Sequence, residues 1–269
     1  MVTLADLKEA LKLFIYGSQG VQLQQKAGTH ELLVEDTGIN IKEALREELQ
    51  VLKRLYPTGK MVFFDDFNEP ELKWGWFYGL GGSGEGAIRD TRYPFMGHAS
   101  MRCNVSGPTM AAYIEPIKFL GYFPEEKMGI ELWFALKDDK LNHIKFGIEY
   151  GDGTNYYVQQ IQYDIPNLWW EVSHAGGDTT IVNTDLVTYC GVKAGTLVWH
   201  HAKAVVDFKT KKHMYAILDG VKYDLSNYSL IQVASPTLFK NATLAYTYVE
   251  SKDGSDAWFD QIAVTIGEK

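Results

Sequence analysis

Residues 199–224 read WHHAKAVVDFKTKKHMYAILDGVKYD, and this stretch decides the fold class. Within it, Val206 and Phe208 share one face of an extended chain, while Val205 and Asp207 share the other. Alternation with a period of two is typical of a β-strand and does not fit a helix. The stretch therefore predicts a strand over residues 199–207.

A hairpin follows in the same stretch. Two further candidate strands, 213–218 and 221–224, are separated only by Asp219 and Gly220. Asp-Gly between two strands favours a two-residue turn, because such turns need positive φ angles that these residues tolerate. We therefore expect neighbouring strands to run antiparallel.

The same signals continue through residues 61–269. Turn residues such as Gly, Asp and Asn recur about every ten residues, which is typical of a β-sandwich or barrel. No strand–helix–strand alternation occurs, so a doubly wound sheet is excluded. The glycine-rich residues 79–86 lack the Lys-Ser/Thr of a phosphate-binding loop, and we expect a flexible loop there. The remaining candidate strands are 60–64, 99–105, 110–114, 129–136, 144–150, 155–161, 168–172, 179–182, 236–247 and 256–265.

Residues 1–60 have a different pattern, which predicts a helix, a short hairpin of strands 21–26 and 31–35, and a second helix. This arm has eight basic and eight acidic residues, so the net charge of -8 belongs to residues 61–269. Proline and glycine near residue 57 end the second helix, and we place the domain boundary at residue 60.

The second predicted helix has an apolar seam with alternating spacings of four and three residues. This seam indicates a short coiled coil that would hold copies of the chain together or dock the arm on a partner. The alternative is that both helices pack onto the following domain. The seam residues are Leu45, Leu49, Leu52 and Tyr56.

Composition excludes several classes of protein. The chain has 269 residues, of which 46% are hydrophobic and 22% charged, so it can bury a core. An acidic chain is poorly suited to nucleic acid or an anionic membrane surface, because both need Lys and Arg. We expect no membrane-spanning segment and no export signal, since charged residues interrupt the apolar N-terminal stretch. Cys103 and Cys190 are expected to be reduced, packed thiols, with pairing across a sheet as the alternative.

Several strand patterns resemble the concanavalin A-like lectin/glucanase superfamily, especially its laminin-G-like members. They are FDDF at 64–67, GIELWF at 129–134, residues 199–207, and WFDQI at 258–262. The resemblance covers residues 61–269 and implies a two-sheet antiparallel jelly roll whose first and last strands are neighbours. The arm, with THELLV at 29–34, resembles the anchoring arms of tailed-phage virion proteins.

The sequence does not predict an enzyme. Glycosidases of this superfamily place two carboxylates on one strand, about 5 Å apart when they retain configuration. Glu131 stands alone on its strand, and Glu149 is followed by Asp152 only across a turn. Asp65 and Asp66 are adjacent, so in a strand they point to opposite faces. Signatures of other hydrolases and of nucleotide-binding loops are also missing.

A structural calcium ion is a weaker expectation, which the resemblance implies. If the first and last strands pair, Asp66 and Asp260 come close together, and carboxylate oxygens suit this cation. The alternative is that these side chains bind backbone amides. His200 and His201 are neighbours on a strand, face opposite ways and so cannot share a metal ion.

Aromatic side chains are the best candidates for contact with a glycan, because sugar rings stack on the faces of Trp and Tyr. In the pair Trp169 and Trp170, we expect one ring in the core and the other exposed. Trp133, Trp199 and Trp258 are expected in the core. The candidate glycan contacts are Trp74, Trp76, Tyr156, Trp169 and Trp170.

Two functions remain open. The first is a non-enzymatic virion structural protein, such as a capsid decoration, a head fibre or a tail component. It would be an oligomer held on a capsid or tail through residues 1–60. The second is a carbohydrate-binding, lectin-like module, with a glycoside hydrolase of the same fold as a lesser variant. The first predicts a location in the virion, and the alternatives are the cytoplasm or export by a non-classical route.

Overall fold

The structure is a computed structural model of residues 1–269. It describes residues 23–25, 32–34, 59–79, 82–107, 112–123, 127–137, 140–186, 197–234, 241–251 and 253–269. The chain forms two compact units, Met1–Leu55 and Tyr56–Lys269. The predicted seam of Leu45, Leu49, Leu52 and Tyr56 lies outside the described residues, and so does Cys190.

The first unit contains the predicted hairpin. Strand β1 (Leu23–Gln25) pairs antiparallel with β2 (Leu32–Val34), with Leu23 opposite Val34. Both strands fall within the segments that the alternating sequence pattern indicated.

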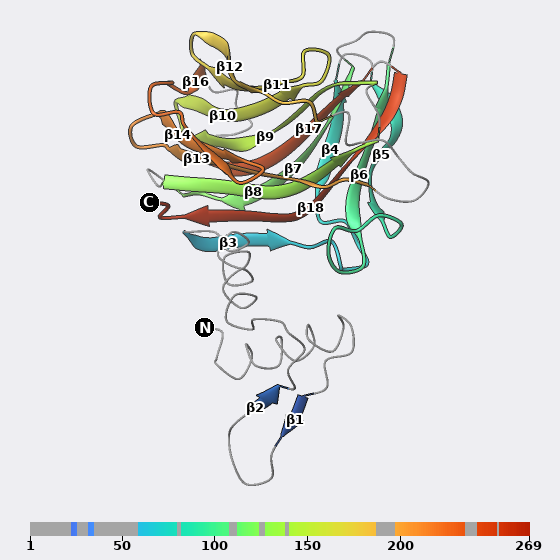
Figure 1. Ribbon diagram of the computed structural model, residues 1–269. Helices are drawn as coiled ribbons and strands as arrows, with labels where there is room; N and C mark the ends of the chain where they lie inside the picture. Colours follow the sequence, from blue (N-terminus) through green and yellow to red (C-terminus); the bar gives the residue numbers. More distant parts are fainter. Residues whose placement is uncertain are drawn as a thin grey trace. The chain divides into compact units, whose positions relative to one another are not determined.

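The second unit is a sandwich of two eight-stranded antiparallel sheets, as the sequence predicted (Figure 1). We name each sheet after a central strand. The β8 sheet has the order β15 (Val221–Asp224), β14 (Lys212–Leu218), β13 (His200–Asp207), β8 (Lys127–Leu136), β18 (Asp253–Ile266), β6 (Ser100–Ser106) and β5 (Ser83–Asp90). In addition, β3 (Lys60–Asp65) pairs with β18.

The β9 sheet has the order β12 (Gly177–Asn183), β11 (Trp169–His174), β10 (Asn155–Asp164), β9 (Leu141–Gly151), β17 (Thr243–Ser251), β7 (Tyr113–Gly121) and β4 (Gly75–Gly79). In addition, β16 (Ile231–Ala234) pairs with β10. Among the residues described, no helix is long and apolar enough to cross a membrane.

The core lies between the two sheets and consists of every second side chain of each central strand. Ile144, Phe146 and Ile148 of β9 are buried there, opposite Leu132 and Phe134 of β8. Each such side chain contributes roughly 1.5–3 kcal/mol by leaving water. The alternate residues of the same strands therefore form the outer faces of the sandwich.

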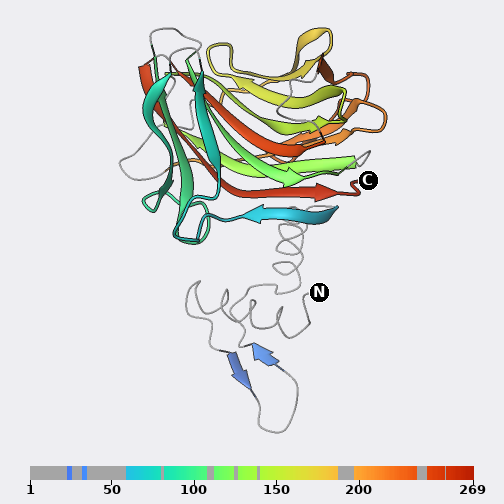
Figure 2. The ribbon, with the colours of Figure 1, turned by 180° about the vertical axis from the view of Figure 1, so that it is seen from behind.

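The first strand of the domain lies beside the last one, as the resemblance implied. Strand β3 runs antiparallel to the second half of β18, with Asp65 opposite Ile262 (Figures 1 and 2). A β-bulge follows Asp260, and Gln261 within it has a φ of 51°. The extra residue shifts the alternation of side chains so that Ile262 faces the core.

The predicted Asp-Gly hairpin is also confirmed. Leu218 of β14 pairs with Val221 of β15, and Asp219 and Gly220 have φ angles of 46° and 84° between them. Positive φ at both central residues is the geometry that matches the twist of the two strands.

The neighbours His200 and His201 face opposite ways, as predicted. The imidazole of His200 lies 2.9 Å from the Asp219 carboxylate, whereas that of His201 lies 3.0 Å from Glu131 on the outer face. The two rings therefore do not form a shared metal site.

Most of the described residues of the glycine-rich segment lie in strands, so the prediction of a flexible loop was wrong for them. Gly79 ends β4 and residues 83–86 begin β5, and these two strands each form an edge of one sheet. At Gly86, with a φ of 88°, an added Cβ would lie 2.9 Å from Nε1 of Trp76. Only glycine fits at position 86, because the indole ring of Trp76 occupies the space that a side chain would need. Gly86 remains part of strand β5.

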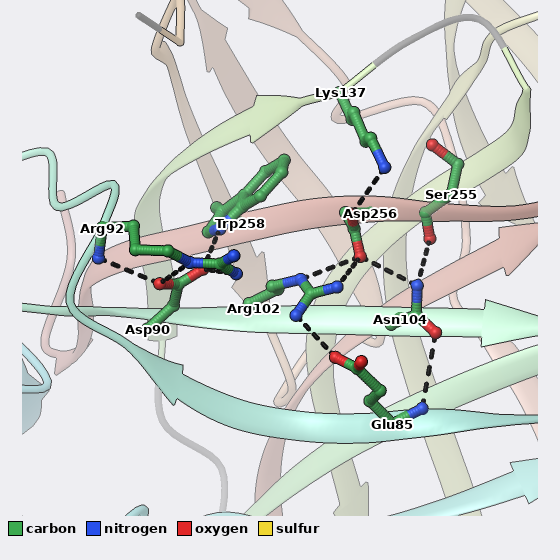
Figure 3. Close-up of polar contacts among 9 residues, drawn as sticks. All are labelled: Glu85, Asp90, Arg92, Arg102, Asn104, Lys137, Ser255, Asp256 and Trp258. Carbon is green, nitrogen blue, oxygen red and sulfur yellow. Dashed lines mark hydrogen bonds and ion pairs between the residues drawn. The ribbon is translucent and has the colours of Figure 1, made fainter. Parts of the chain in front are cut away.

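The outer face of the β8 sheet is held by a cluster of ion pairs near β5 (Figure 3). Asp256 accepts hydrogen bonds from Arg102 at 2.9 Å, Asn104 at 2.8 Å and Lys137 at 3.1 Å, and Arg102 also contacts Glu85. These side chains pair with one another across β5, β6 and β18, so the cluster joins strands.

Candidate functional site

The outer face of the β9 sheet carries two rows of side chains that cross the strands. Each row consists of residues that lie opposite one another in neighbouring strands, so their side chains share this face. The histidine row comprises Tyr113 of β7, Glu250 of β17, His143 of β9, Asp164 of β10 and Trp169 of β11. The lysine row comprises Phe77 of β4, Glu115 of β7, Tyr248 of β17, Lys145 of β9, Gln162 of β10 and Glu171 of β11.

The centre of the histidine row is a chain of hydrogen-bonding groups. His143 lies between two carboxylates, with Nδ1 3.2 Å from Glu250 and Nε2 3.4 Å from Asp164. The Tyr248 hydroxyl donates to the other oxygen of Glu250 at 3.1 Å, and Asn167 donates twice to Asp164. These contacts fix the polar groups in place before any ligand arrives.

The pairing of His143 with Glu250 shifts the pKa values of both side chains. Burial alone would lower the pKa of His143, but the hydrogen bond and the charge of Glu250 raise it above its ordinary value. Burial would raise the pKa of Glu250, but the bond from His143 lowers it. The imidazolium and the carboxylate therefore stabilise each other in the folded protein.

Aromatic rings stack at the β4 end of the rows. The rings of Tyr113 and Tyr248 are 4.6 Å apart and nearly parallel, and Phe77 meets Tyr113 edge-on at 6.1 Å. The ammonium group of Lys145 lies 4.6 Å from the centre of the Tyr248 ring. Phe77 remains 42% exposed, so this end presents an aromatic surface to the solvent.

Glu115 occupies the lysine row next to these rings, opposite Phe77. Burial raises the pKa of its carboxyl group to about 7, against the opposing charge of Lys145. Near neutral pH the group can therefore donate a proton in a hydrogen bond as well as accept one.

Next to the two rows on the same face, Tyr246 and Glu149 are buried. An added Cβ at Gly147 would lie 2.8 Å from the Tyr246 hydroxyl, which is 3.1 Å from the Gln160 side-chain oxygen. The Tyr246 side chain thus spans β9, and it is only 2% exposed. Farther along β9, Glu149 is buried, and the hydroxyl of Tyr156 is hydrogen-bonded to it. The side chains of Tyr246 and Glu149 therefore offer a ligand little surface.

Two of the predicted glycan contacts lie in the core and cannot meet a ligand. Trp74 is 2% exposed and donates its indole N–H to Asp65 at 3.0 Å. Trp170 is also 2% exposed and packs edge-on against Phe134. The alternation along β11 buries Trp170 and leaves Trp169 on the outer face, as expected for that pair.

The other predicted contacts do not form one site. Trp76 is 45% exposed, but it lies on the opposite side of β4 from Phe77, over Gly86. Tyr156 shares the outer face with Trp169 but lies at the other end of β10, outside the rows. Of the predicted set, Trp169 alone belongs to the rows.

The carboxylates proposed for calcium are already occupied by N–H donors. Asp66 accepts two hydrogen bonds from Asn68. Asp260 accepts backbone N–H groups at 2.7–3.2 Å from Phe95, Met96 and Gln261. Within the described part of the chain, no three His, Cys, Asp or Glu side chains are grouped to hold a metal. These hydrogen bonds match the alternative, in which the aspartates bind N–H groups, and a shared calcium site stays a prediction.

The sequence indicated part of the rows through the alternation in residues 244–250, but the predicted end of the strand was placed too early to include all of them. In residues 244–250, the polar or aromatic Tyr246, Tyr248 and Glu250 alternate with the buried Ala245 and Val249. The predicted strand ended at residue 247, which left Tyr248 and Glu250 outside it. A strand with polar aromatic residues on one face indicates a face that does not pack on the core.

No protein-family model matches the sequence, and no curated protein matches it. Solved structures are similar in fold. One is a conserved carbohydrate esterase of the Shiga toxin-encoding bacteriophage phi24B, 13% identical, with a TM-score of 0.48. That match covers 77% of this chain and 99% of the esterase.

Two further similar structures are a sialidase and a family 11 carbohydrate-binding module from Clostridium thermocellum. The sialidase is 9% identical with a TM-score of 0.45, and the match covers 77% of this chain but only 19% of the sialidase. The module is 15% identical with a TM-score of 0.39, covering 79% of this chain and 98% of the module. At TM-scores below 0.5, these similarities assign no function to the chain.

Proposed function

We propose that the protein is a non-catalytic, carbohydrate-binding β-sandwich that holds a glycan across the histidine and lysine rows. One observation carries this proposal. The stacked rings of Tyr113 and Tyr248, 4.6 Å apart, lie directly beside the hydrogen-bonded groups Glu250, His143 and Asp164. Aromatic faces that adjoin fixed polar groups are the usual means of binding a sugar.

The polar groups are suited to hydroxyls because they are already held by neighbours. The side chains of His143, Asp164 and Glu250 are 26%, 13% and 11% exposed, so each keeps a limited accessible surface. Groups fixed before binding lose little conformational freedom when the ligand arrives. Five spacings between strands separate β4 from β11, or roughly 24 Å, which suits an oligosaccharide better than one sugar ring.

The arrangement of carboxylates supports binding without hydrolysis. Glu250 and Asp164 are both bridged by His143, whereas in a glycoside hydrolase one carboxyl group protonates the leaving oxygen and the other attacks the sugar or activates water. Glu149 is buried and bonded to Tyr156.

A glycoside hydrolase remains the second candidate, because the pKa of Glu115 is raised to about 7 on the same face. Release of reducing sugar from a bound glycan by the wild type, and its loss in Glu115→Gln, would establish that candidate instead.

The test of the proposed site is a glycan array followed by titration calorimetry with the best ligand. We expect Tyr248→Ala to weaken binding about tenfold, since a stacked ring contributes on the order of 1.4 kcal/mol. The matched control is Phe119→Ala, an aromatic on β7 that is 55% exposed and outside the rows. Equal losses in both variants, or no bound glycan at all, would contradict the proposal.

We further propose that this carbohydrate-binding protein is a structural component of a virion. A glycan-binding sandwich would be displayed on a particle, with residues 1–60 attached to a capsid or tail protein and to other copies of the chain. What supports it is the amphipathic pattern of that arm and its confirmed hairpin. Copurification of the full chain with assembled particles tests it, and a chain found only in the particle-free fraction would count against it.

A further inference from the structure

We infer that the glycan is uncharged, and that the two rows reject sugars carrying a carboxylate or a sulfate. This inference rests on the proposed function. The rows contain four carboxyl groups and only two basic side chains. The acidic residues are Glu115, Asp164, Glu171 and Glu250, and the basic residues are Lys145 and His143.

Both basic groups already have partners. His143 is within 3.4 Å of two carboxylates, so its positive charge is more than balanced by its neighbours. The ammonium of Lys145 lies over the Tyr248 ring at 4.6 Å, and its charge also opposes the raised pKa of Glu115. An anionic sugar that approached His143 would therefore meet the two carboxylates that flank it, and near Lys145 it would meet Glu115, which carries part of a negative charge at neutral pH.

The β9 sheet also lacks the side chain best suited to an anionic sugar. Arginine binds carboxylate and sulfate with two parallel N–H groups, and none of the strands of this sheet contains one. In the described part of the chain, the arginines lie on β5, on β6 and just after β5, where they hold other protein groups, and Figure 3 shows the latter two. Arg89 donates to the Phe67 carbonyl at 2.8 Å, and Arg92 and Arg102 pair with Asp90 and Asp256.

A neutral sugar meets complementary groups instead. Its hydroxyls can donate to the carboxylates of Asp164 and Glu171 and accept from the amide of Gln162. A hydroxyl needs no counter-charge, so the acidic surface costs it nothing in repulsion. Binding of the neutral sugar should therefore depend little on ionic strength, whereas rejection of an anionic one should weaken in salt.

The experiment compares neutral oligosaccharides on an array with the same oligosaccharides bearing sialic acid, uronic acid or sulfate, at low and high salt. At low salt, we expect the acidic derivatives to bind at least about tenfold more weakly than their neutral parents, because several like charges lie nearby. In 0.5 M salt, the difference should shrink to about threefold or less.

A charge-neutralised double variant, Glu115→Gln with Glu171→Gln, should reduce the difference in affinity between neutral and acidic oligosaccharides at low salt. Acidic derivatives that bind as tightly as their parents would overturn this inference and leave the proposed function standing. A chain that binds neither kind would overturn both. A salt-independent difference would also overturn it, since that result indicates a steric cause instead of a charge.

Discussion

Glu149 shows what the outer face of the β9 sheet does to a single carboxyl group. Burial raises its pKa to about 8, although the hydrogen bond from Tyr156 opposes the shift. The folded protein therefore holds this proton more tightly than the unfolded chain, whose Glu releases it near pH 4.5. Folded Glu149 adds stability below pH 4.5, and this contribution is lost progressively as the pH rises to about 8.

We predict that Glu149→Gln removes this dependence, because an amide keeps the shape and does not ionise. Urea unfolding of both proteins between pH 4 and pH 9 measures it. The wild type should lose on the order of several kcal/mol relative to the variant across that window, with little change above it. Parallel pH profiles for the two proteins would contradict the prediction.

Local sequence patterns predict only part of the site. Alternation along a strand requires Trp169 and Trp170 to face opposite ways, so that division could be predicted. Which of the two enters the core depends on the register of β11 against β10, and this register cannot be predicted from the local sequence. Trp74 is buried in the core, and its indole N–H donates to Asp65, nine positions earlier, a contact that only the folded turn creates.

At the scale of the strand, Gly147 is a position where β9 allows no side chain. An added Cβ would lie 1.9 Å from the Gln159 carbonyl oxygen and 2.8 Å from the Tyr246 hydroxyl. We predict that Gly147→Ala lowers the free energy of unfolding by about 3 kcal/mol or more, because β9 and β10 would have to separate.

The matched control is Gly75→Ala on β4 of the same sheet, where the nearest atom to an added Cβ is 3.9 Å away. That variant should change stability by less than about 1 kcal/mol in the same chemical unfolding experiment. Equal losses would mean that the effect comes from the strand backbone and not from the crowding at Gly147.

Elements with a strong local signal could be predicted, and those defined by distant partners could not. The hairpin of β14 and β15 follows from Asp219 and Gly220 alone. Strands β4 and β5 were missed because their glycines resemble a loop, although one of these glycines, Gly86, is required by the Trp76 ring that packs on it. The full length of β17 was missed because its outer face is polar, and that face carries the site.

At the scale of the whole molecule, the arm is predicted to hold copies of the chain together. A chain that begins at Tyr56 retains the entire second compact unit and tests this expectation. We predict that the full chain is an oligomer by light scattering and that the shortened chain is a monomer with an unchanged circular dichroism spectrum in the β region. A shortened chain with the mass of the full oligomer would show that the arm does not cause association.

The fold class could be predicted from the repeated strand patterns of residues 61–269, whereas the pairing of the terminal strands was implied by the resemblance to the concanavalin A-like superfamily. The distribution of charge could also be predicted, with the surplus of acidic residues after residue 60. The location of the rows could not, because their members come from six strands whose order in the sheet is unrelated to their order in the chain.

The position of β18 has a consequence for how the protein is made. This strand fills the middle of the β8 sheet, yet every strand beside it precedes it by a long stretch, and Ile262 pairs with Asp65, 197 positions earlier. While a ribosome is still short of residue 253, β3, β6 and β8 each lack a neighbour. Their open edges can join other nascent chains, so synthesis should benefit from a chaperone until β18 emerges. Refolding in a test tube should likewise be slow, since it waits on contacts between distant parts of the chain.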